Sequence, residues 1–289
     1  MALKKVKYNL PATEIDMGGF PVKQAFPTNS VSNLDPFLLL HHARVKPIYD
    51  RLAKHQGIGP HPHRGFSPVT FVIEGGVHHR DSLGHNQKSK AGDVQWMHAG
   101  AGIIHSERPT QEVIDKKQVQ EIVQLWINSP AVVKMNIPSY QYLDSDRIPT
   151  QISEDEKSVL RIITGKYQGL LGPAKSQSKT LIIWNIGIKG SSVKFKVEEG
   201  ESTSIYLIKG EISIKEYGNI DPESLVHFEK SNTEIEITSD SNYQLLLLSG
   251  KPINEKIVQH GPFVMNTQTE ILEAMRDYQM GKMGILIEE

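Results

Sequence analysis

Short β-type runs separated by turn residues extend along nearly the whole chain, and this pattern restricts the fold most. Residues 70–73 are β-branched and aromatic and end at Glu-Gly-Gly, while residues 193–197 alternate apolar and Lys side chains, the period of a half-buried strand. The run from Gln244 to Leu248 predicts a central, fully buried strand. Many short strands with turn signals between them predict an all-β protein, built as a sandwich or barrel.

Helical spacing is convincing in one stretch only. Apolar side chains recur there at three- and four-residue intervals: Ile271, Ala274, Met275 and Tyr278. Gly281 supplies a stop signal. We therefore expect one short C-terminal helix, at about residues 269–280.

A polar, proline-interrupted stretch from Ser139 to Lys157 lacks a hydrophobic period and is the predicted linker. A chain of 289 residues has room for two domains of roughly 140 residues each. We expect two all-β domains in tandem, residues 1–145 and residues 146–289, with the helix at the end of the second.

Composition excludes several classes of function. The net charge of −1 lacks the basic footprint of a bulk nucleic-acid binder, so no direct nucleic-acid binding is expected. No apolar run approaches the roughly 18 residues of a membrane span, and the first residues lack an apolar signal region, so we expect no membrane association and a cytoplasmic protein, or a nuclear one in a eukaryote. Cysteine is absent, which excludes disulfides, thiolate metal sites and cysteine nucleophiles.

Histidine is unevenly distributed. Ten of the twelve lie within one stretch: His41, His42, His55, His61, His63, His78, His79, His85, His98 and His105. Without thiols, clustered imidazole is the natural way for this chain to hold a transition metal. His227 and His260 have no partners at metal-binding spacing and are interpreted as structural.

Two pairs of ligand-type residues stand at strand spacing. His61 and His63 are two residues apart, as are His105 and Glu107, and side chains at positions i and i+2 of a strand point to the same face. Two strands could thus offer three imidazoles and one carboxylate to one ion, a set that suits iron, manganese, nickel, cobalt or copper. The alternative is that these are incidental polar residues on a barrel.

The spacing resembles the two cupin motifs, and the residues around them resemble the pirin family. The matching segments are Leu34–Leu39, Pro60–Phe66, Glu74–Gly76, Asp81–Gly84, Gly92–Met97, Ala99–Glu107, Gly261–Thr267 and Tyr278–Lys282. The resemblance implies a bicupin, two jelly-roll-like β-barrel domains in tandem, with metal in the N-terminal one only. Carried over residue by residue, the ligands are His61, His63, His105 and Glu107.

The resemblance also implies a cofactor and a function. The cofactor is one divalent transition metal, iron(II) first, with nickel, manganese, cobalt, copper and zinc as alternatives. One hypothesis is a quercetin 2,3-dioxygenase-type oxidoreductase that takes a flavonol-like aromatic and dioxygen and releases carbon monoxide, with Glu107 as the catalytic proton acceptor. The other is a non-enzymatic metal- or redox-sensing regulatory protein that binds a protein partner.

The chain departs from the family pattern at Ser67, where the first motif usually has Glu, and at the His41-His42 pair, where acidic residues are common. Three further interpretations concern residues near the motifs. Phe66 and Trp96 are expected in the barrel core, and one of His78 and His79 should face inward as a hydrogen-bonded rim residue. Arg64 either steers an anion or forms a salt bridge.

Overall fold

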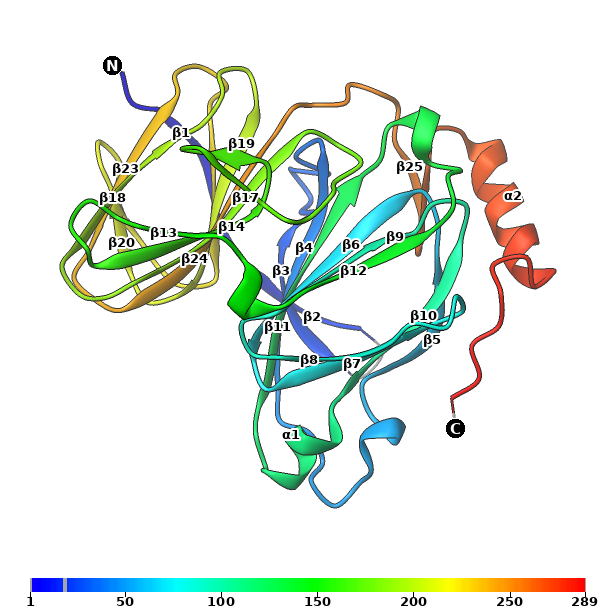
Figure 1. Cartoon of the computed structure of the whole chain (residues 1–289). Helices are drawn as coiled ribbons and strands as arrows, with labels where there is room; N and C mark the ends of the chain where they lie inside the picture. Colours follow the sequence, from blue (N-terminus) through cyan, green and yellow to red (C-terminus); the bar gives the residue numbers. More distant parts are fainter. Residues whose placement is uncertain (1, 18–19, 289) are drawn as a thin grey trace. The chain divides into compact units, whose positions relative to one another are not determined.

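The computed structural model describes residues 2–17 and 20–288, and strands are its main regular structure (Figure 1). The expected all-β architecture of two β-barrel domains with a short C-terminal helix is confirmed. Each of the two compact units of the chain contains a larger and a smaller antiparallel sheet.

The two units are interleaved along the chain. The first barrel comprises Met17–Val22, Leu40–Asp146 and Ile253–Glu289, and the second comprises Met1–Asp16, Lys23–Leu39 and Arg147–Pro252. The sequence prediction divided the chain once, between residues 145 and 146, whereas the N-terminal residues group with the second barrel and the last segment groups with the first. The N-terminal strand joins the second barrel because it pairs with a strand near residue 226.

The first barrel has two sheets. The larger contains, in spatial order, β12 (Ser139–Leu143), β9 (Val94–His98), β6 (Phe66–Glu74), β11 (Gln120–Asn128) and β4 (Phe37–Val45). The smaller contains β5 (Ile58–His63), β10 (Ile103–Pro109), β7 (Gly76–Asp81) and β8 (Asn86–Lys90). Short helical turns connect them: η1 (Ala53–His55), α1 (Gln111–Asp115) and η2 (Ala131–Val133). Two further strands precede β4 in the chain, β2 (Thr13–Asp16) and β3 (Pro21–Phe26).

The second barrel repeats this plan. Its larger sheet has the order β1 (Val6–Pro11), β22 (Ser224–Phe228), β19 (Ser202–Lys209), β24 (Tyr243–Gly250), β17 (Thr180–Gly187), β14 (Ser158–Thr164) and β13 (Thr150–Ile152). Its smaller sheet has the order β18 (Ser191–Lys196), β23 (Glu234–Ser239), β20 (Ile212–Ile214) and β21 (Gly218–Ile220), and a two-stranded hairpin joins β15 (Lys166–Tyr167) to β16 (Leu170–Leu171).

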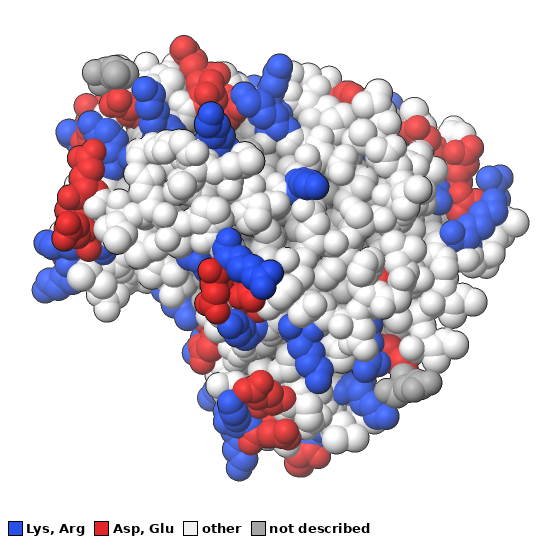
Figure 2. Space-filling view, viewed as in Figure 1, with Lys and Arg blue, Asp and Glu red and all other residues white. Residues whose placement is uncertain are grey.

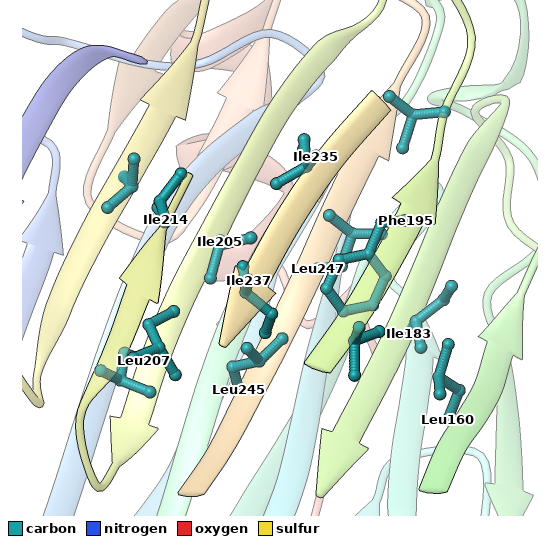
Figure 3. Close-up of a cluster of buried hydrophobic side chains, with 14 of the residues drawn as sticks. Leu160, Ile183, Phe195, Ile205, Leu207, Ile214, Ile235, Ile237, Leu245 and Leu247 are labelled. Atoms are coloured by element: carbon teal, nitrogen blue, oxygen red, sulfur yellow. The ribbon is translucent and has the colours of Figure 1, made fainter. Parts of the chain in front are cut away.

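Aliphatic side chains fill the interior of the second barrel (Figure 3). On β18 the buried Val193 and Phe195 alternate with exposed lysines, as the period of two predicted. The β24 strand is central, between β19 and β17, and its Leu245 and Leu247 point into this core. The alternation observed in the sequence therefore packs two sheets against each other.

Removing one of these core side chains should cost much of the second barrel's stability. In Leu247→Ala we expect the free energy of unfolding to fall by about 2–5 kcal/mol, since the lost burial and the cavity left behind add together. Leu272→Ala, at a position 58% exposed, is the matched control and should change it by less than about 0.5 kcal/mol. Equal effects of the two changes in denaturant titrations would contradict this assignment of the core.

The segment expected to be a linker contains regular structure. Its first residues form β12, which pairs with β9, and its later residues form β13, which pairs with β14, with the 3₁₀ turn η3 (Ser145–Arg147) between them. Tyrosines occupy alternate positions of β12, at Tyr140 and Tyr142. The Tyr142 hydroxyl donates to Asp93. The sequence does not predict these strands because they lack an aliphatic period and acidic residues lie between them.

The C-terminal segment packs on the first barrel. After the hairpin of β25 (Val258–His260) and β26 (Phe263–Met265), helix α2 runs from Gln268 to Gln279, close to the predicted bounds. A Thr267–Glu270 capping box begins it. Further on, the Glu288 carboxylate accepts hydrogen bonds from Ser106 and pairs with Arg108, both on β10. The smaller sheet is therefore fastened by residues near the end of the chain.

Among the residues described, no helix is long and apolar enough to cross a membrane. On the face drawn in Figure 2, Lys and Arg lie among Asp and Glu and do not form one large area of a single sign.

Candidate metal centre

Three of the four predicted ligands meet at one point in the first barrel. His61 and His63 extend from β5, and His105 lies on the neighbouring β10, directly opposite His61 in the strand pairing. The ring centroids are 4.7 Å apart for His61 and His63, 4.4 Å for His61 and His105, and 4.9 Å for His63 and His105. One ligand nitrogen from each ring lies within 4.8 Å of the others.

Backbone carbonyls orient two of these rings. The Nδ1 atom of His61 is 2.9 Å from the Gly59 carbonyl oxygen, and that of His63 is 3.4 Å from the Pro262 carbonyl oxygen. Because a carbonyl oxygen only accepts, each Nδ1 carries the hydrogen and donates it. Each Nε2 is left with a free lone pair, the form in which imidazole binds a metal.

The buried rings are neutral. Burial, reinforced by His61, lowers the pKa of His63 well below its ordinary value, against the opposing effect of the Pro262 carbonyl. Burial, followed by the neighbouring histidines, does the same to the pKa of His105. Neutral imidazoles can bind a cation without first losing a proton.

The group fits a divalent transition ion. The Nε2 atom of His105 is buried and has no hydrogen-bond partner among the described residues, which is costly unless something else fills its lone pair. An ion about 2.1 Å from each nitrogen would satisfy all three rings. His61, His63 and His105 are thus the residues that could hold a metal here.

Glu107, the fourth predicted ligand, lies on the same strand as His105 but is not part of the three-histidine group. A bulge between the two residues shifts the pairing of β10 with β5. The buried carboxylate accepts hydrogen bonds from the Thr70 hydroxyl at 2.8 Å and from the Gln124 amide at 2.7 Å. These donors on β6 and β11 fix its orientation.

An aromatic wall adjoins the histidines. The rings of Phe66 and Trp126 lie 5.2 and 5.4 Å from that of His63, and the Trp126 Nε1–H donates to Gln124. Phe66 and Trp96 are fully buried, as expected for core residues, whereas Thr70, Gln124 and Trp126 are not among the predicted site residues. The alternation of Gln124 and Trp126 with the buried Val123 and Leu125 was the available signal.

A second set of polar side chains lies behind His105 on β7. As expected, one of the adjacent histidines faces inward: His79 is buried, whereas His78 is half-buried and bonds to Asn86. Burial would raise the pKa of Asp81, but hydrogen bonds from His79 and His85 outweigh it and leave that pKa below its ordinary value. Asp81 is therefore a buried carboxylate at neutral pH.

The remaining residues singled out in the sequence have structural contacts. Arg64 is buried and forms an ion pair with Asp277 of α2 at 3.1 Å, so the salt-bridge interpretation is the one that the contacts support. His98 lies outside the three-histidine group, with its Nδ1 3.4 Å from the Ser67 hydroxyl. In the second barrel, His227 bonds through Nδ1 to the Ser204 hydroxyl.

Two antiparallel barrels, the first carrying paired histidines on adjacent strands, define the bicupin class. Residues 19–127 match the model of the Pirin family, and residues 185–284 match that of the Pirin C-terminal cupin domain. The chain belongs to the pirin family.

Individual relatives agree with this assignment over most of their length. Human pirin is 33% identical over 97% of this chain and 94% of its own. A Pseudomonas aeruginosa protein named "Putative quercetin 2,3-dioxygenase" is 36% identical over 91% of this chain and 92% of its own. The crystal structure of a quercetin 2,3-dioxygenase from Acinetobacter baumannii is similar with a TM-score of 0.91 and 34% identity, covering 99% of this chain and all of the other.

Proposed function

We propose that this chain holds one divalent transition ion, iron(II) first among the candidates, at His61, His63, His105 and Glu107, and that it cleaves a flavonol-type substrate with dioxygen. The observation that carries the proposal is the convergence of three imidazoles, with the buried Glu107 side chain on the same strand as His105. The similarity to the Acinetobacter baumannii quercetin 2,3-dioxygenase supports the choice of substrate class.

Glu107 has the capacity for the fourth position. A carboxylate offers about four lone-pair directions, and the Thr70 and Gln124 donors use two of them. The remaining lone pairs are available to a cation or to a proton. The two donors hold the carboxylate in place while it serves either partner, so little reorganisation is needed.

The residues suggest how a flavonol would be handled. When bound, the ion supplies Lewis-acid and one-electron chemistry. Three neutral imidazoles and one carboxylate leave a formal charge of +1 on a divalent centre, which attracts a substrate anion. Glu107 takes the proton from the hydroxyl next to the ring carbonyl, while the half-buried ring of Trp126 offers an apolar contact for the substrate rings.

Anaerobic purification, elemental analysis and oxygen uptake with and without quercetin test the proposal. We expect about one metal ion per chain and quercetin-dependent oxygen uptake in the iron(II)-loaded protein, with carbon monoxide released. The His61→Ala variant is the control that should lose both. Stoichiometric iron with no uptake on quercetin or related flavonols would reject the dioxygenase and favour the non-enzymatic, partner-binding role.

A further inference from the structure

Three buried side chains form a line that ends at one of the proposed ligands. The Asp81 Oδ2 atom lies 3.0 Å from Nε2 of His79, and Nδ1 of His79 lies 3.4 Å from Nδ1 of His105. All three are at most 3% exposed. The pairing of β10 with β7, which sets His105 opposite Asp81, brings the three groups together.

The direction of each hydrogen bond in this line follows from the partners of Asp81. Its Oδ1 accepts from the backbone amides of Leu83 and His85, and its Oδ2 accepts from the rings of His79 and His85. Four N–H groups converge on this carboxylate, so it acts only as an acceptor. The hydrogen of a neutral His79 is therefore on Nε2, and its Nδ1 is an acceptor. His105 must then donate from Nδ1, which leaves the lone pair on its Nε2.

We infer that His79 and Asp81 are positioning residues that hold His105 in the tautomer whose Nε2 faces the metal. The inference rests on the proposed metal site and deepens it. His61 and His63 obtain the same tautomer from the carbonyls of Gly59 and Pro262, whereas His105 obtains it from a side-chain relay. A carboxylate behind a ligating imidazole, even through a second ring, also makes that ligand more basic.

Packing holds the His79 ring in place between Asp81 and His105. The ring of Tyr140 stacks on that of His79, with centroids 4.2 Å apart and planes inclined by 15°. His85 also bonds to Asp81, at 2.8 Å, but its side chain is 40% exposed and does not lie between Asp81 and His105. Asp81 therefore has two histidine partners, of which only His79 also contacts His105. His85 is the matched control for His79.

The Asp81→Asn variant should reverse the direction of both hydrogen bonds, from residue 81 to His79 and from His79 to His105, with little change in side-chain shape. The two backbone amides that face Oδ1 will keep the new amide oxygen on their side, so the NH₂ group will face His79. His79 Nε2 must then accept, its Nδ1 must donate, and His105 is left with the hydrogen on Nε2. Metal affinity should fall by about 10- to 100-fold, the usual effect of losing such a partner. His79→Phe keeps the ring that stacks on Tyr140, removes the acceptor and should give a loss of similar size.

The test measures cobalt(II) binding. Competition with a chelator gives the affinity, and the visible absorption spectrum reports on the ligands of the bound ion. We expect both variants to bind more weakly with a changed spectrum, while His85→Phe binds within about twofold of the parent. If circular dichroism shows that Asp81→Asn is not folded, the affinity and spectrum of His79→Phe are the test. Unchanged affinity and spectrum in the folded variants would overturn the relay. Failure of the parent to bind cobalt(II), or binding unaffected by His61→Ala, would instead reject the metal site itself.

Discussion

The His105→Ala variant is expected to lose its metal while it stays folded. The ring supplies one of three converging nitrogens, and its Nε2 has no other partner among the described residues, so the substitution removes a ligand and leaves the two rings on β5. Metal content after iron(II) loading and desalting should fall from about one ion per chain to background. The hydrophobic interior of the second barrel contains none of the ligands and should unfold as in the parent.

The matched control is His227→Ala, which removes a buried histidine from the second barrel. Its metal content should equal that of the parent in the same elemental analysis. One bound ion per chain in His105→Ala, or in a variant lacking both His61 and His63, would show that the ion is held elsewhere.

The second large effect is expected in Glu107→Gln. The substitution keeps an oxygen near the proposed ion but removes the charge and the proton acceptor, so flavonol turnover should fall by roughly 10² or more, the scale of losing a general base. Metal content should fall only modestly. The change also sets an amide NH₂ where Gln124 donates, which will turn one of the two amides.

Thr70→Val separates the two consequences, because it removes a donor to the carboxylate and leaves the charge in place. We expect its turnover to stay within about tenfold of the parent. Oxygen uptake and metal content measured on all three proteins are the test. Full turnover in Glu107→Gln would refute the role of Glu107 as the proton acceptor.

Much of the site could be predicted from the sequence because its information is local. The two-residue spacing of His61 and His63 predicts that both rings lie on one face of a strand, and in the structure both rings meet that of His105. The partners that orient those rings could not be found this way. Pro262 lies 199 residues from His63, and no pattern around either residue indicates that they meet.

The fold shows the same limit. Alternating apolar residues predicted the strands of the second barrel, because a strand between two layers must bury one face. The pairing of β1 with β22 depends on a sheet edge formed more than two hundred residues later, and local periodicity carries no trace of it. Helix α1 escaped prediction for another reason: it is a single turn, five residues long, started by the Thr110 cap.

The interleaving of the two units has a consequence for synthesis on the ribosome. The strand that carries His105 leaves the ribosome early. Pro262, whose carbonyl orients the His63 ring, and Glu288, which bonds to Ser106 on the smaller sheet, follow only after the whole of residues 147–252. A nascent chain halted before residue 253 would have its three histidines and lack the carbonyl that turns His63. The proposed metal site should therefore be complete only after residues 147–252 have been translated.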